Sequence, residues 1–279
     1  MYLKAFSIYM KHITIILLTI IFHLVMSGFT NAEELVELQT RPGVTQKFIL
    51  IKPNNPMLSV ILFAGGQGNL ELSSDYAGKP VIGWGKGNFL VRSRDLFASH
   101  GFMVAVVDAP SDHKEEDGML YGFRSSQEHV TDIEHVIGYL KKQANIPVWL
   151  IGTSRGTESA AHIAIHTEKK INGLVLTSSM AEENDKGTTV TNMAIDRITI
   201  PTLVVANEDD DCWLTPPSGA KEIARLLVNS PKVEVIYFSG GDESISKNPC
   251  RALTHHGYLG IEEQVVSAIA KWIKKIENF

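Results

Sequence analysis

Residues 148–156 read Val-Trp-Leu-Ile-Gly-Thr-Ser-Arg-Gly, an apolar run that ends in the pattern Gly-x-Ser-x-Gly. The apolar part, 148–151, predicts a buried strand, and the small apolar residues of 157–168 predict a helix that packs closely on a sheet. A serine in the tight turn between such a strand and helix is a nucleophile elbow, whose flanking glycines let the two elements approach without a side-chain clash. This context favours Ser154 as a nucleophile over an incidental serine in an ordinary strand-turn-helix.

The rest of the chain alternates predicted strands with predicted helices. The predicted strands are 47–51, 59–63, 102–107, 173–177, 201–206 and 233–238. The predicted helices are 88–97, 125–143, 217–229 and 261–276. Strands and helices at this spacing imply an α/β fold with a mostly parallel sheet and helices on both faces. The polar segment 33–42 is predicted to be a loosely held lead-in, and 181–200 is too short for a large lid.

Two polar clusters that follow the elbow supply candidates for the base and the acid that a nucleophilic serine requires. Residues 207–212 read Asn-Glu-Asp-Asp-Asp-Cys and follow a predicted strand, at the end where the active-site loops of parallel sheets gather. A histidine pair lies in the loop before the last helix. The chain order is therefore serine, acid, histidine. The candidate acids are Asp209, Asp210 and Asp211, and the candidate bases are His255 and His256.

A glycine cluster follows the predicted strand 59–63, where residues 64–68 read Ala-Gly-Gly-Gln-Gly. A loop without bulky side chains can bring backbone N–H groups close to a developing negative charge. The cluster is not a phosphate loop, because no Lys-Ser/Thr follows it, nor a dinucleotide fingerprint, because 69–78 does not predict a strong helix. The alternative to an oxyanion-binding role is a flexible turn.

With these motifs in this order, the chain resembles the α/β-hydrolase superfamily from the glycine loop at 65–68 to His256. The family pattern Gly-x-x-Asp matches Asn207 to Asp210 with Asn in place of Gly, and the family histidine commonly precedes a glycine, which selects His256. The resemblance therefore implies a triad of Ser154, Asp210 and His256.

The resemblance also implies how the reaction intermediate is stabilised. The oxyanion would be bound by the N–H of Arg155 and by one N–H from Gly66 or Gln67. No cofactor and no metal are implied. A loop with His113, Asp112 and Glu115 could bind a metal in principle, but no second histidine stands at ligand spacing, which favours a solvated loop.

The expected activity is a serine hydrolase that cleaves carboxylic esters, small-molecule or polymeric, through an acyl-enzyme. The alternatives are a peptide or amide hydrolase with the same triad and a non-catalytic binding protein that keeps the fold. The stretches 88–94, 108–112 and 152–157 are also similar to a group of exported bacterial hydrolases, a resemblance that names no substrate.

The first 32 residues predict a secretory signal peptide, with two lysines before an apolar stretch and Thr-Asn-Ala at 30–32. The alternative is an uncleaved anchor, for which the apolar run 13–26 is short. Cleavage after Ala32 would leave 33–279 as one hydrolase domain, secreted or periplasmic, without stable membrane insertion. Since 1–32 contains two lysines and no acids, the net charge would change from −5 to −7, which argues against nucleic-acid binding. The oligomeric state is left open.

The chain contains two cysteines, Cys212 and Cys250. In an exported chain such a pair predicts one disulfide, and the alternative is two free buried thiols. A bridge would close a loop of about 39 residues, worth about 4 kcal/mol in the chain-entropy model. It would also join the acid loop to the segment before His256 and hold the two in register.

Overall fold

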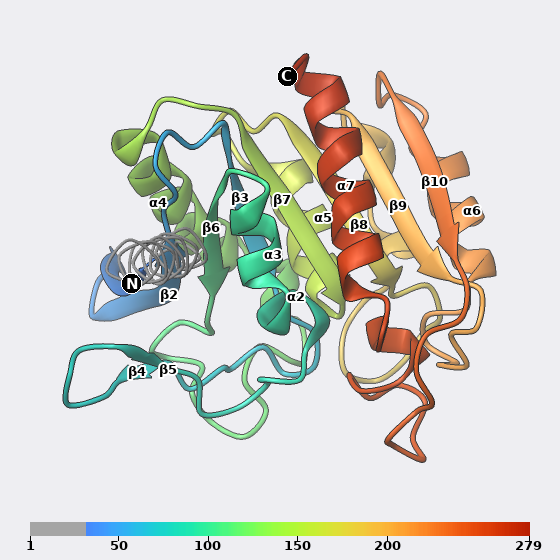
Figure 1. The fold of residues 1–279 in the computed structure, drawn as a ribbon, viewed down its shortest axis with the longest axis horizontal. Coiled ribbons are helices and arrows are strands. Elements are labelled where there is room, and N and C mark those ends of the chain that lie inside the picture. The colour runs from blue at the N-terminus through green and yellow to red at the C-terminus, as the bar shows by residue number, and fades with distance from the viewer. Residues whose placement is uncertain (1–31) are drawn as a thin grey trace, which may run out of the picture. The chain divides into compact units, whose positions relative to one another are not determined.

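The computed structural model describes residues 32–279 (Figure 1). The predicted signal segment falls on residues that, except for Ala32, lie outside this range, so it stays a prediction. Residues 33–279 form one compact unit. Among the described residues, no helix combines the length and the apolar character that crossing a membrane requires.

An eight-stranded sheet in the order β1-β2-β6-β3-β7-β8-β9-β10 forms the centre of this unit. The strands are β1 (Glu33–Arg41), β2 (Val44–Ile51), β3 (Leu58–Phe63), β6 (Phe102–Val107), β7 (Val148–Ser154), β8 (Gly173–Ser179), β9 (Thr202–Asn207) and β10 (Val233–Phe238). From β6 to β10 every neighbouring pair is parallel, whereas β2 pairs antiparallel with both β1 and β6. The predicted mostly parallel sheet is confirmed.

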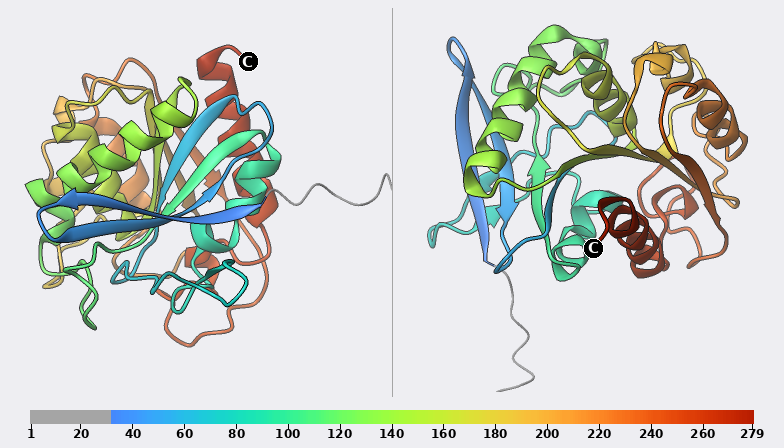
Figure 2. Two further views of the ribbon diagram at one scale, coloured as in Figure 1. Left: turned by 90° about the vertical axis from the view of Figure 1, so that its left-hand side faces the viewer. Right: turned by 90° about the horizontal axis from the view of Figure 1, so that it is seen from above.

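Helices cover both faces of the sheet (Figure 2). One face packs against α2 (Phe89–Arg92), α3 (Arg94–Ser99) and α7 (Glu262–Glu277). The other packs against α4 (Gln127–Gln143), α5 (Gly156–His166) and α6 (Ser218–Leu226). The middle strand β3 is buried along its whole length, with Val60 and Leu62 in the first core and Ile61 and Phe63 in the second. This two-sided burial explains why the central strands are continuous apolar runs.

The structure corrects three details of the sequence prediction. The segment 33–42 is an edge strand rather than a loose lead-in, because β1 forms an antiparallel hairpin with β2 through a turn at Gly43, whose φ is +73°. The predicted helix 88–97 is divided at Ser93 into α2 and α3. The predicted helix 125–143 begins two residues later, at Gln127, because Ser126 is the N-cap of α4 and its side chain accepts from the N–H of His129.

The connection between β8 and β9 forms no lid. It contains only two short 3₁₀ turns, Val190–Asn192 and Ile195–Arg197. A small two-stranded hairpin, β4 (Ser73–Ser74) and β5 (Pro80–Val81), lies in the connection after β3. The carboxyl ends of the parallel strands are therefore bordered by loops, the longest of which is 64–88 after β3.

Candidate active site

Ser154 ends β7 in the left-handed region of backbone space, with φ at +52°. A non-glycine residue in this region costs about 1–3 kcal/mol, which the surrounding packing must supply. That packing is tight, because a Cβ on Gly152 would lie 2.4 Å from the Gly156 carbonyl oxygen, and a Cβ on Gly156 would lie 2.0 Å from the Phe63 carbonyl oxygen. Only glycine fits at either position, so both glycines of the elbow are required by close backbone approach.

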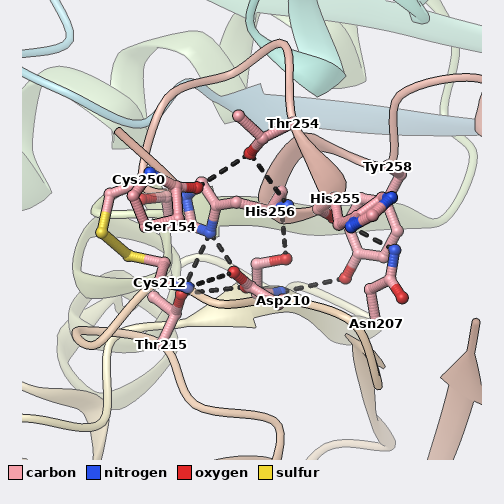
Figure 3. Close-up of polar contacts among 12 residues, drawn as sticks. Ser154, Asn207, Asp210, Cys212, Thr215, Cys250, Thr254, His255, His256 and Tyr258 are labelled. Carbon is pink, nitrogen blue, oxygen red and sulfur yellow. Dashed lines mark hydrogen bonds and ion pairs between the residues drawn. A yellow bond between two sulfur atoms is a disulfide. The ribbon is translucent and has the colours of Figure 1, made fainter. Parts of the chain in front are cut away.

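Asp210 and His256 form a buried pair (Figure 3). The Asp210 Oδ2 atom lies 3.0 Å from His256 Nδ1, and Asp210 Oδ1 accepts from the Cys212 N–H at 2.9 Å. Thr215 donates its hydroxyl to Asp210 Oδ2 at 3.0 Å and lies 3.0 Å from His256 Nδ1. This network assigns the proton of a neutral His256 to Nδ1, which leaves Nε2 as the lone-pair nitrogen that a general base needs.

The structure separates the remaining candidates from this pair. Asp209 is exposed, and its Oδ2 accepts from the Gly240 N–H at 2.5 Å. Asp211 is also exposed. His255 contributes its backbone carbonyl, which accepts from Asn207 Nδ2 at 3.2 Å. Among the three acids and two histidines, only Asp210 and His256 meet through their side chains.

Several residues that the sequence analysis did not identify hold the histidine loop in place. Ser178 donates its hydroxyl to the His256 carbonyl at 2.9 Å, and its own N–H donates to the Tyr258 hydroxyl at 3.1 Å. Tyr258 is fully buried and donates to the Val205 carbonyl at 3.0 Å. Burial raises the pKa of Tyr258, so the hydroxyl keeps its proton and remains a donor. The loop is thereby tied to β8 and β9.

A cavity of about 270 Å³ contains both Ser154 and His256 in its wall. Its lining residues are Gly65, Gly66, Trp84, Gly85, Lys86, Gly87, Asn88, Phe89, Thr153, Ser154, Cys250, Arg251, Ala252, His256 and Gly257. Segment 84–89 therefore borders the site, whereas segment 111–124, which lies between β6 and α4, contributes no lining residue. The lining contains the cations Lys86 and Arg251 and no carboxylate.

Arg92 forms hydrogen bonds to two segments of the cavity wall. Its guanidinium donates to the carbonyls of Gly87 and Gly257 and pairs with Glu262 at 2.8 Å. Because one helix residue holds loops from both sides, the cavity shape depends on α2 being correctly placed. The arginine has no sequence signal for this role, since two of its partners, the Gly257 carbonyl and Glu262, lie 165 and 170 residues away in the chain.

The glycine loop lies against the nucleophile. A Cβ on Gly65 would lie 2.8 Å from Ser154 Cβ and 3.4 Å from its Oγ. The backbone N–H groups of Gly66, Gln67 and Arg155 have no hydrogen-bond acceptor among residues 32–279. Unpaired N–H groups beside a serine hydroxyl are what an oxyanion site requires.

Cys212 and Cys250 form the predicted disulfide. It links the acid loop, where the Cys212 N–H bonds Asp210, to the wall of the cavity that Cys250 lines. Ligand atoms of Asp210, Cys212 and His256 lie within 4.8 Å of one another, but Cys212 is oxidised and therefore offers no thiolate to a metal.

Comparison with known proteins bears on the fold. Residues 90–196 match the family described as serine aminopeptidase, S33. An esterase from Pyrococcus furiosus aligns with a TM-score of 0.61 at 16% identity, over 88% of this chain and 93% of its own. The chain has the α/β-hydrolase fold.

Further solved structures align with this chain over most of its length. A cold-adapted esterase from an Arctic intertidal metagenomic library gives a TM-score of 0.58 at 14% identity, over 86% of this chain and 93% of that chain. A serine hydrolase from Xanthomonas campestris, described as having no lid, gives 0.53 at 12% identity, over 89% and 94%. No curated protein sequence matches the chain.

The three consecutive aspartates of the acid loop can be distinguished by mutation. Asp210→Asn should lower kcat for an ester by about 10³–10⁴-fold, because an amide can impose the wrong tautomer on His256. Asp209→Asn and Asp211→Asn are the matched controls and should stay within about threefold of wild type. Steady-state kinetics on folded proteins provides the measurement. An equal loss in either control would contradict the assignment to Asp210.

Proposed function

We propose that this chain is a serine hydrolase that cleaves carboxylic esters through an acyl-enzyme. The proposal rests on one observation above the others: Ser154 and His256 line the same cavity, and His256 is paired with the buried Asp210. Esterases among the solved structures of the same fold support it. Asp210 as the triad acid and Gly66 or Gln67 as an oxyanion donor with Arg155 belong to the same proposal.

The proposed reaction has two steps, each with the same acid–base partner. His256 Nε2 takes the proton of Ser154 as its Oγ attacks the ester carbonyl, and the carbonyl electron pair moves onto the oxygen, which the loop N–H groups bind. His256 then gives this proton to the departing alcohol as the C–O bond breaks. Water attacks the acyl-enzyme with the roles repeated, releasing the acid and restoring Ser154. Asp210 stabilises the charged His256 throughout.

A peptide or amide hydrolase is the second candidate, and the match to the serine aminopeptidase family favours it. The same triad would serve, with His256 protonating an amine. We further propose that the protein is exported through its N-terminal 32 residues, since a disulfide within the domain suits an oxidising compartment. A panel of esters beside matched amides separates the two activities.

Ser154→Ala should lower turnover of 4-nitrophenyl acetate by at least about 10⁴-fold, because the nucleophile is lost. Unfolding by urea should stay close to wild type, because the change removes one oxygen at the cavity surface. Retained turnover in Ser154→Ala would contradict the proposal.

The unpaired cations of the cavity should favour esters that carry a negative charge. Lys86 and Arg251 are exposed and contact no carboxylate within residues 32–279. The acetyl ester of 4-hydroxybenzoate, which is negatively charged, should have a kcat/KM about fivefold above that of the neutral acetyl ester of 4-hydroxybenzamide. Both values are corrected for the reactivity of the two esters with hydroxide. About 0.5 M salt should reduce the difference, because it screens the charges.

Lys86→Gln should weaken this preference, whereas Lys169→Gln, an exposed lysine in the connection between α5 and β8, should leave it unchanged. Equal kcat/KM for the two esters at low salt would show that the cations do not select substrate.

A further inference from the structure

Arg124 is a fully buried cation behind the glycine loop. It lies in the 3₁₀ helix Phe123–Ser125, is only 1% exposed, and belongs to the segment that contributes no residue to the cavity. Burial lowers its pKa to about 10, which still leaves the guanidinium charged at neutral pH.

The guanidinium forms three hydrogen bonds that join the two sides of the proposed oxyanion site. Its Nη2 donates to the Ala64 carbonyl at 3.0 Å and to the Gly66 carbonyl at 3.1 Å. Its Nη1 donates to Ser159 Oγ at 2.7 Å, in the first half of α5. The glycine loop and the helix that begins after the nucleophile are thus held by one planar group.

These contacts fix the loop amides because peptide groups are planar. The Gly66 carbonyl shares its peptide plane with the Gln67 N–H, so anchoring that carbonyl sets the direction of that N–H. The Ala64 and Gly66 carbonyls belong to the peptides on either side of the one that carries the Gly66 N–H, so both flanks of that peptide are held in place. Arg124 therefore orients the Gln67 N–H directly and fixes the positions of the two Cα atoms between which the Gly66 N–H lies.

The loop is built around the guanidinium. A Cβ on Gly68, whose φ is +76°, would lie 2.5 Å from Arg124 Nη2 and 2.3 Å from Met119 Cε. The Met119 N–H donates to the Gln67 carbonyl at 2.8 Å, which adds a second anchor from the same segment. Glycine at 68 is therefore the residue that lets the arginine reach the loop.

The local charges are also suited to an oxyanion. The buried Glu158 pairs with Arg155 at 3.2 Å and its charge also favours the charged form of Arg124. These three groups together carry one net positive charge. A buried arginine is costly to desolvate, and its Nε has no partner within residues 32–279, whereas an apolar side chain would fill the same space without that cost. Packing alone therefore does not account for an arginine here.

We infer that Arg124 is a positioning residue for the oxyanion site, which sets the spacing between the Arg155 N–H on the nucleophile side and the glycine-loop N–H facing it. It touches no substrate and acts through the Ala64 and Gly66 carbonyls and through Ser159. This inference rests on the proposed function, because it presupposes an oxyanion at Ser154.

The test compares Arg124→Met and Arg124→Lys with wild type on phenyl acetate and on phenyl thionoacetate, its C=S counterpart. Well-placed N–H donors favour an oxyanion over a thiolate-like sulfur, so the ratio of the two rates reports donor placement. In Arg124→Met we expect kcat for the ester to fall about 100-fold, KM to change less than about threefold, and the ester-to-thionoester ratio to fall about tenfold.

Arg124→Lys keeps the charge but has a single nitrogen, which cannot bridge the loop and the helix. In this variant we expect kcat to fall about tenfold, one-tenth of the loss in Arg124→Met, and the ester-to-thionoester ratio to fall as well. Arg94→Met is the control, since Arg94 lies on α3, pairs with Glu33 of β1 and, within residues 32–279, forms no hydrogen bond or ion pair with the glycine loop. Its rate ratio should equal that of wild type. Unfolding curves identify the folded variants.

A folded Arg124→Met protein with wild-type kcat, or with a lowered kcat at an unchanged ratio, would overturn the inference. If that variant does not fold, Arg124→Lys decides by the same ratio. Absence of ester turnover by the wild-type chain would instead overturn the proposed function.

Discussion

The left-handed conformation of Ser154 is the constraint on which the rest of the site depends. It is enforced from two sides, because Gly156 lies against the Phe63 carbonyl and Gly152 lies against the Gly156 carbonyl. The buried strands β3 and β7 hold those backbones at a fixed separation, so core packing supplies the free energy that the strained turn requires. The stability of the sheet thus fixes the position of the Ser154 hydroxyl.

The loops that carry Asp210 and His256 are fixed at several points. The acid loop is anchored by the disulfide, and the histidine loop is anchored by Ser178 and Tyr258 from inside the fold. Arg92 and Arg124 have similar roles, since each donates to two backbone carbonyls and each reaches a loop that is distant in sequence. Preorganisation of this kind means that the site needs little rearrangement when charge develops on a substrate.

The elbow, the parallel sheet and the cysteine pair could be predicted because their signals are local or depend only on chain order. The local pattern identified the candidate acid less clearly, because three aspartates are consecutive in the sequence. Only the folded structure separates them, since it buries Asp210 and exposes Asp209. Strand β1 was missed because an edge strand with one solvent-exposed face has a polar composition. Arg124 and Tyr258 carry no motif, and their roles arise from contacts across about 60 and 50 residues.

Covalent labelling of the serine tests the central claim most directly. The folded protein would be treated with a fluorophosphonate, and the labelled peptide would be identified by mass spectrometry, with Ser154→Ala treated in parallel. The account predicts one adduct, on Ser154, and none in the variant, because only a serine activated by His256 in the elbow reacts readily. A folded wild-type protein that takes up no label, or a variant that is labelled as fully as wild type, would contradict it.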